Sequence, residues 1–126
     1  MNKKRLYLVF VPDENIDESR SEYSDVIAWS YKNLSSQNVL SLNLEEIYYI
    51  QENSEIFDII NEENGSMLQV GEDDWIFSNE IKINIQKKLN VYKKKVLSER
   101  TQKIIQDLLL LLNISIRTNK NLYFVF

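Results

Sequence analysis

The chain begins and ends with short apolar runs. Residues 6–11 are apolar at every position and stop at Pro12, which is typical of a strand buried on both faces. Residues 122–126 form a second such run at the other end. Leucines alternate with polar residues over 40–44, which predicts a half-buried strand. We expect both terminal runs to lie inside one sheet.

Apolar residues spaced by three and four positions predict the helices. Ser19 and Glu22 have the spacing of a capping box, so a first helix is expected from there to about Ser35. Ser54 can cap a second, short helix that Asn64 and Gly65 end. The expected buried face of the first helix contains Tyr23, Val26, Ile27, Tyr31 and Leu34.

Two longer helices are expected in the second half of the chain. Isoleucines at 81, 83 and 85 alternate as in a strand, but a helical face from Ile81 to Val96 covers more residues. We therefore favour a helix from about Glu80 to Leu97. Another helix restarts at Ser98 or Thr101, and its expected buried face contains Ile104, Ile105, Leu108, Leu109 and Leu112.

Four short segments complete the predicted elements. Residues 47–50 fit a strand that continues the sheet, although a short helix fits nearly as well. Residues 67–70 and 75–77 suggest two strands around an acidic turn, Gly71-Glu72-Asp73-Asp74. Residues 114–116 and 122–126 suggest a closing hairpin. The predicted fold is α+β, a single domain over 1–126 with one mixed sheet of four to six strands and three or four helices.

The residue types that are missing restrict the chemistry. The 126 residues include no cysteine and no histidine, which removes thiolate nucleophiles, sulfur-ligated metals and the commonest general base. Two glycines and one proline leave little material for a phosphate-binding loop. We therefore expect no enzymatic activity, no cofactor and no metal site.

Charge is divided unevenly along the chain. Residues 1–80 contain five basic and seventeen acidic residues, a net charge of −12, and residues 81–126 contain ten basic and two acidic residues, a net charge of +8. The acidic half should attract basic partners and repel nucleic acid. Alternatively, the two halves neutralise each other across an internal interface.

No segment predicts membrane insertion. Residues 3–5 are basic and precede six apolar residues, fewer than the core of a signal peptide needs. Residues 104–116 are interrupted by polar side chains and are shorter than the roughly 20 residues of a membrane span. The expected location is therefore the cytoplasm.

The acidic turn beside a tryptophan is the strongest candidate for a binding site. Aromatic anchors surrounded by charge are typical of protein interfaces. Trp29 is a second candidate, because it lies off the expected buried face of the first helix. Trp75 in the core, with the acids serving solubility, is the alternative. The predicted partner-binding residues are Glu72, Asp73, Asp74, Trp75 and Trp29.

Two other site hypotheses use different residues. The lysine-rich segment 87–103, which includes Tyr92 among its basic residues, could bind the phosphate backbone of a nucleic acid. Alternatively, its lysines form only the solvated face of a helix. Asp74, Glu80 and Lys82 resemble the acidic and Glu-x-Lys elements of restriction-endonuclease-like nucleases, which implies Mg²⁺-dependent cleavage. A helix end with acids near its N-terminus explains the same residues without catalysis.

In size, acidity and lack of catalytic residues the chain resembles bacterial immunity proteins of contact-dependent growth inhibition and other polymorphic toxin systems. The resemblance implies a small inhibitor that neutralises a basic partner, a nuclease toxin, by covering its active site. It carries no motif, so it assigns no residues. A phage-encoded inhibitor of a host nucleic-acid-binding protein has the same general features. Partner identity, oligomeric state and source organism stay open.

Overall fold

The computed structural model describes residues 5–96 and 98–126, and its centre is a four-stranded sheet in the order β2-β1-β4-β3. Each neighbouring pair of strands is antiparallel, where a mixed sheet was expected. The two terminal runs form the central strands, as predicted. The strands are β1 (Tyr7–Phe10), β2 (Val39–Leu42), β3 (Asp73–Ile76) and β4 (Leu122–Val125).

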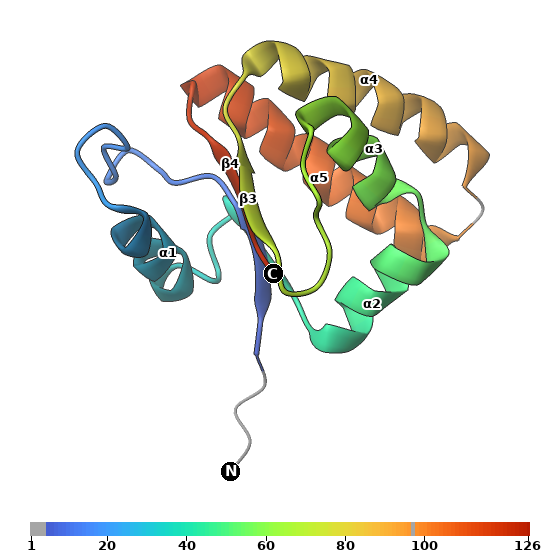
Figure 1. The fold of residues 1–126 in the computed structure, drawn as a ribbon, viewed down its shortest axis with the longest axis horizontal. Helices are drawn as coiled ribbons and strands as arrows, with labels where there is room; N and C mark the ends of the chain where they lie inside the picture. Colours follow the sequence, from blue (N-terminus) through green and yellow to red (C-terminus); the bar gives the residue numbers. More distant parts are fainter. Residues whose placement is uncertain (1–4, 97) are drawn as a thin grey trace.

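Helices cover both faces of the sheet, so the molecule has three layers. Figure 1 shows α1 on one side of the sheet and the other helices on the opposite side. The α+β class with a single sheet is confirmed, with five described helices in place of three or four. They are α1 (Tyr23–Lys32), α2 (Leu44–Asn53), α3 (Ile56–Asn64), α4 (Asn79–Lys95) and α5 (Glu99–Thr118). None of these helices is long and apolar enough to cross a membrane.

The alternation of side chains along the strands creates two cores. Leu8 and Phe10 of β1 face α1, whereas Tyr7 and Val9 face the larger helical layer. The α1 core is small, and its buried members are Leu8, Phe10, Val26, Trp29, Val39, Tyr123 and Val125. Because β3 pairs with β4, the core to which each β4 side chain belongs shows on which side of the sheet its β3 partner lies.

Two predicted strands are helical. Residues 47–50 lie within α2, where Ile47 and Ile50 are buried one turn apart. Asn43 and Glu46 form a capping box at the start of α2, a signal that favours the helical alternative. The predicted hairpin at 114–116 is also wrong, because α5 continues through these residues to Thr118 and is capped by Asn119 in the left-handed conformation, with φ of 55°.

Asp73 and Asp74 of the predicted acidic turn lie in a strand, whereas Gly71 is in a turn. Residues 67–70 form no strand, and β3 begins at Asp73. Asp73 pairs with Val125 and Trp75 with Tyr123, so both side chains lie on the α1 side of the sheet. Asp74 and Ile76 lie on the opposite side. Both backbone polar groups of Trp75 bond to side chains, since the N–H donates to Asp74 Oδ1 (2.8 Å) and the carbonyl accepts from Asn64 Nδ2 (3.2 Å).

The first helix is shorter and rotated relative to the prediction. Its capping box uses Glu22 and Asp25, not Ser19 and Glu22. Trp29 is only 8% exposed, and its ring lies 6.1 Å from that of Phe10. The prediction that Trp29 lies off the buried face is therefore wrong. Tyr31, expected on the buried face, is exposed instead.

The remaining helices form where they were predicted, but the predicted cap at Ser54 is wrong, because Ser54 is the C-cap of α2 and the N-cap of α3 is Glu55. Gly65 ends α3 in the left-handed conformation, and Ser98 caps α5 by accepting from Thr101 N–H. The helical interpretation of the segment from Glu80 is correct, and α4 ends at Lys95. Its predicted last residue, Leu97, lies outside the described residues, as do residues 1–4.

Candidate functional site

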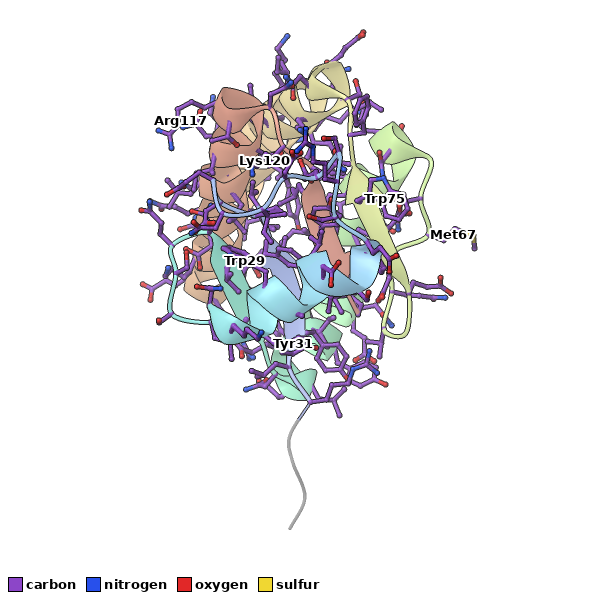
Figure 2. All side chains as sticks on the ribbon, turned by 90° about the vertical axis from the view of Figure 1, so that its left-hand side faces the viewer. Trp29, Tyr31, Met67, Trp75, Arg117 and Lys120 are labelled. Atoms are coloured by element: carbon purple, nitrogen blue, oxygen red, sulfur yellow. The ribbon has the colours of Figure 1, made fainter. Side chains whose placement is uncertain are left out.

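An acidic surface lies on the α1 side of the molecule, and Figure 2 views this side directly. We call it the acidic face. It combines the loop at 13–22, the first turn of α1 and the start of β3. Residues 13–25 alone contain six acidic residues against one basic residue, Arg20. The carboxylates of the acidic face are Asp13, Glu14, Asp17, Glu18, Glu22, Asp25 and Asp73, and none of them is buried.

A row of tyrosines joins the three parts of the acidic face. Tyr123 donates its hydroxyl hydrogen bond to Glu18 Oε2 (2.6 Å), and its ring lies 6.2 Å from that of Tyr23. Tyr23 in turn donates to Asp73 Oδ2 (3.2 Å) and lies 5.9 Å from the Trp75 ring. The loop, α1 and β3 are therefore held together by direct contacts under the carboxylates.

These contacts keep the tyrosines neutral and a loop carboxylate charged. Burial, together with the neighbouring Asp73, raises the pKa of Tyr23 well above its usual range. Burial and the hydrogen bond to Glu18 do the same for the pKa of Tyr123. Hydrogen bonds from Ser19 lower the pKa of Asp17. Near neutral pH the tyrosines thus act as hydrogen-bond donors, and Asp17 is ionised.

The two halves of the chain neutralise each other only in part. Among the described residues, ion pairs between the halves involve Glu45 with Arg100 and Lys88 with Glu62 and Glu63. These pairs link α2 to α5 and α3 to α4, away from the acidic face. On the acidic face, the described ion pair is Arg20 with Asp17 at 3.6 Å, and both side chains are exposed. The excess of negative charge therefore faces solvent on the α1 side.

The structure brings together some of the predicted partner-binding residues and separates others. Asp73 and Trp75 lie on the acidic face, and exposed Glu72 directly precedes β3. Trp75 is 49% exposed, which excludes the fully buried alternative. Asp74 points to the other side of the sheet, at its edge. Trp29 lies beneath α1, where no partner reaches its ring without local unfolding.

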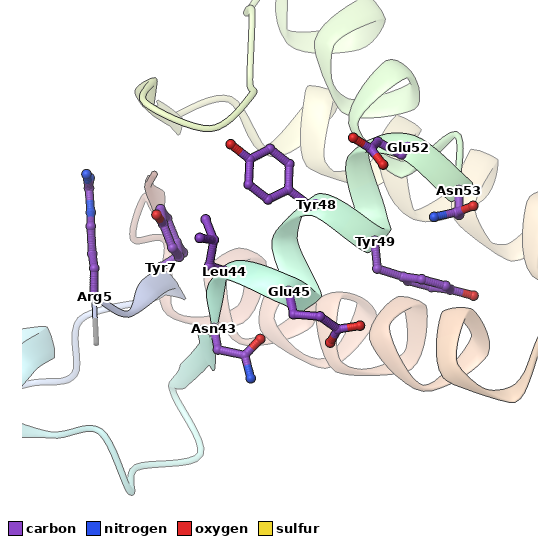
Figure 3. A pocket seen from close by; sticks show the side chains of 9 residues that line it. All are labelled: Arg5, Tyr7, Asn43, Leu44, Glu45, Tyr48, Tyr49, Glu52 and Asn53. Atoms are coloured by element: carbon purple, nitrogen blue, oxygen red, sulfur yellow. The ribbon is translucent and has the colours of Figure 1, made fainter. Parts of the chain in front are cut away.

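A hollow of about 870 Å³ lies apart from the acidic face, between the start of β1 and α2 (Figure 3). The charged groups at its rim mostly have partners within the chain. The Arg5 guanidinium stacks on Tyr7 at 5.0 Å from the ring centroid, and Arg100 stacks on Tyr49 at 4.2 Å. Glu45 is paired with Arg100. The described lining residues therefore form no catalytic arrangement.

The nuclease hypothesis does not fit the geometry. Lys82 is 1% exposed and donates to Asn79 Oδ1 (3.0 Å) and the Lys120 carbonyl (2.8 Å), whereas Glu80 is exposed. Burial lowers the pKa of Lys82. Among the described residues no three acidic side chains are grouped to hold a metal ion. Lys82 is therefore a buried structural residue.

Three of the seven basic residues of the lysine-rich segment are paired within the chain. Lys88, Arg100 and Lys103 form ion pairs with acidic residues. The Tyr92 hydroxyl accepts a hydrogen bond from the Glu55 N–H (3.0 Å) and is half-buried. Tyr92 therefore ties α4 to the start of α3.

Comparison with known proteins identifies the family of the chain. A family model described as DMP12, a DNA-mimic protein, matches residues 5–126. This chain belongs to the DMP12 family of DNA-mimic proteins. The match includes every carboxylate of the acidic face.

Relatives of the DMP12 family agree with this assignment. The DNA mimic protein DMP12 of Neisseria meningitidis serogroup B is 27% identical over 127 residues, and the alignment covers all of both chains. The solved structure of Neisseria DNA mimic protein DMP12 has a TM-score of 0.77 at 23% identity, covering 97% of this chain and 100% of that one. The three-layer fold is therefore shared with a solved DNA mimic.

Membership of the DMP12 family corrects the functional predictions. The immunity-protein assignment is wrong, as are the toxin inhibitor and contact-dependent growth inhibition roles and the nuclease toxin partner, because the family match names a different class over nearly the whole chain. The nucleic-acid-binding and nuclease alternatives are wrong for the same reason. Small size, acidity and absent catalytic residues are common to many inhibitors of basic proteins, so they could not separate these classes.

Sequence reasoning missed most of the acidic face. It selected the acids beside Trp75 but not the group at 13–25, whose six carboxylates lie within thirteen residues. That density was a usable signal. The contacts of Tyr23 and Tyr123 with acids 50 and 105 positions away were not readable from the sequence.

Proposed function

We propose that this chain is a DNA mimic whose acidic face occupies the DNA-binding surface of a protein in place of DNA. It acts by binding and not by catalysis. The observation that carries the proposal is the solvent-facing group of seven carboxylates, of which Asp17 alone is ion-paired among the described residues. A protein with this function works where DNA-binding proteins are, which for a bacterial protein is the cytoplasm.

The density of charge on the acidic face suits this role. Each strand of DNA carries a phosphate about every 3.4 Å along the helix axis. Glu22 and Asp25 are three residues apart at the start of α1, which places their Cβ atoms about 5–6 Å from each other. Neighbouring acids at 13–14 and 17–18 supply comparable local density. Lysines and arginines that grip successive phosphates would find carboxylates at similar intervals.

The aromatic pair beside Asp73 supplies the centre of the proposed interface. Trp75 and Tyr23 are in contact, partly exposed, and flanked by carboxylates. An arginine from the partner can stack on such rings while its guanidinium bonds to an acid. We therefore place Glu72, Asp73 and Trp75 in the contact, with Asp74 at its edge.

A competition experiment tests the proposal. Proteins that a DNA column retains from the source organism are passed over the immobilised chain, and each captured protein is then purified. The chain should displace a fluorescent duplex from that protein as the molar ratio of chain to binding sites approaches one. In a direct titration without DNA, the affinity of the chain for the same protein should fall as salt increases. If no DNA-binding protein is captured, or if chain and duplex bind together in a ternary complex, the proposed function is wrong.

Replacing Trp75 with alanine should weaken partner binding without unfolding the chain. Because half of the side chain is exposed, its loss should reduce the free energy of unfolding by about 1 kcal/mol or less, whereas an interface anchor contributes about 2 kcal/mol or more to binding. Titration calorimetry and urea unfolding measure the two effects. Tyr48→Ala is the control, since Tyr48 is 41% exposed but lies on α2, on the opposite side of the sheet from the acidic face (Figure 1). Equal affinities for both variants would remove Trp75 from the interface.

A further inference from the structure

The acidic loop at 13–22 is held in place by a lysine at its base. Lys120 donates from Nζ to two backbone carbonyls of the loop, those of Asp13 and Ile16, at 2.5 Å each. Glu18 accepts from the Asn121 N–H at 3.2 Å and from the Tyr123 hydroxyl. Adjacent residues after α5 therefore fix the loop at both its beginning and its middle.

Lys120 is itself held by the helical layer. Its N–H donates to the Ser115 carbonyl (3.1 Å), and its own carbonyl accepts from the Ser115 hydroxyl and from buried Lys82 Nζ (2.8 Å). The buried lysine of α4 thus fixes the backbone of Lys120, and the side chain of Lys120 fixes the loop. Figure 2 shows Lys120 beside the loop, beyond α1.

We infer that Lys120 is a positioning residue for the acidic face: it orders the loop before the partner arrives. This inference rests on the proposed function. A polar loop of ten residues that ordered only on binding would lose affinity to conformational entropy. Lys120 uses its charge on backbone carbonyls, so it orders the carboxylates without forming an ion pair with any of them among the described residues.

Whether Lys120→Met strengthens or weakens partner binding distinguishes a positioning role of Lys120 from a purely electrostatic one. Lys120→Met removes a positive charge from an acidic surface, which by charge alone should strengthen binding to a basic partner. If Lys120 positions the loop, the variant should instead bind about tenfold more weakly, with a faster dissociation rate and an association rate that is unchanged or higher. The probe is the protein displaced from DNA in the competition experiment, and surface plasmon resonance gives both rates.

Two further variants control the measurement. Arg20→Met also removes one positive charge from the same loop, but Arg20 is 86% exposed and its described ion pair is with Asp17, so this variant should bind as tightly as the parent or more tightly. Lys120→Arg keeps the charge and the donors and should restore the dissociation rate. If Lys120→Met destabilises the chain globally, Lys120→Gln, which keeps an amide donor group on a shorter and uncharged side chain, replaces it.

Amide hydrogen exchange tests the positioning without a partner. In Lys120→Met the N–H groups of Ile16, Ser19 and Arg20 should exchange at least about tenfold faster, while those of β1 and β4 keep their protection. Unchanged loop protection, or tighter binding by Lys120→Met, would overturn the inference. Absence of any displaced DNA-binding partner would overturn the proposed function, and the affinity role with it, whatever the exchange data show.

Discussion

Neutralising three carboxylates of the acidic face should weaken partner binding by about ten- to a hundredfold, or roughly 1.4–2.8 kcal/mol. The variant is Glu14→Gln, Glu22→Gln and Asp25→Asn. The amide oxygens introduced at positions 22 and 25 can still accept the capping hydrogen bonds of α1, so charge changes while the fold does not. Most of the loss should appear in the association rate, because these exposed groups steer the partner.

A matched triple variant controls for overall charge. Glu52→Gln, Glu55→Gln and Asp58→Asn change the net charge by the same amount, and these exposed residues of α2 and the start of α3 are outside the described ion pairs. This variant should bind within about threefold of the parent. Equal losses in the two variants would mean that the partner responds to net charge or uses a different surface. Stopped-flow association at two salt concentrations distinguishes these cases.

Trp29→Ala should lower the free energy of unfolding by about 3–5 kcal/mol. The side chain belongs to the small core between α1 and the sheet, in contact with Phe10, and neighbouring side chains cannot collapse far enough to fill its volume. Urea unfolding followed by far-ultraviolet circular dichroism measures the change.

Tyr31 on the same helix provides the comparison for Trp29. It is 43% exposed, so Tyr31→Ala should cost about 1 kcal/mol or less. A stable Trp29→Ala variant with lost partner affinity would show that the ring leaves the core to make contact. That result would restore the interface role that the sequence first suggested for Trp29.

The fold class was predictable because the strongest patterns were long or unambiguous. A run apolar at every position can only be buried on both faces, and this placed β1 and β4 at the centre of the sheet. The failures were short segments where helix and strand periods coincide. Isoleucines at 114 and 116 alternate, but they flank the buried stripe of Leu111, Leu112 and Ser115 and so belong to a helix.

The candidate site was predictable only where a short stretch of sequence was enough to mark a residue as exposed and charged. An aromatic residue among acids marked the region of Trp75 correctly as exposed and charged. Placing Asp73 and Asp74 in a turn treated them as one cluster, whereas a strand sends successive side chains to opposite faces. The buried face of α1 was misjudged by about one position, which exchanged the environments of Trp29 and Tyr31.

The hydrogen bonds between side chains and the Trp75 backbone determine whether another chain can add a strand at the β3 edge. An edge strand with free N–H and carbonyl groups is a template on which another chain can add a strand. At Trp75 both groups are occupied, by the carboxylate of Asp74 and the amide of Asn64. A partner therefore meets side chains there and not an open ladder. Asp74, which adds negative charge, thus also obstructs the addition of a strand from another copy of the chain at this position.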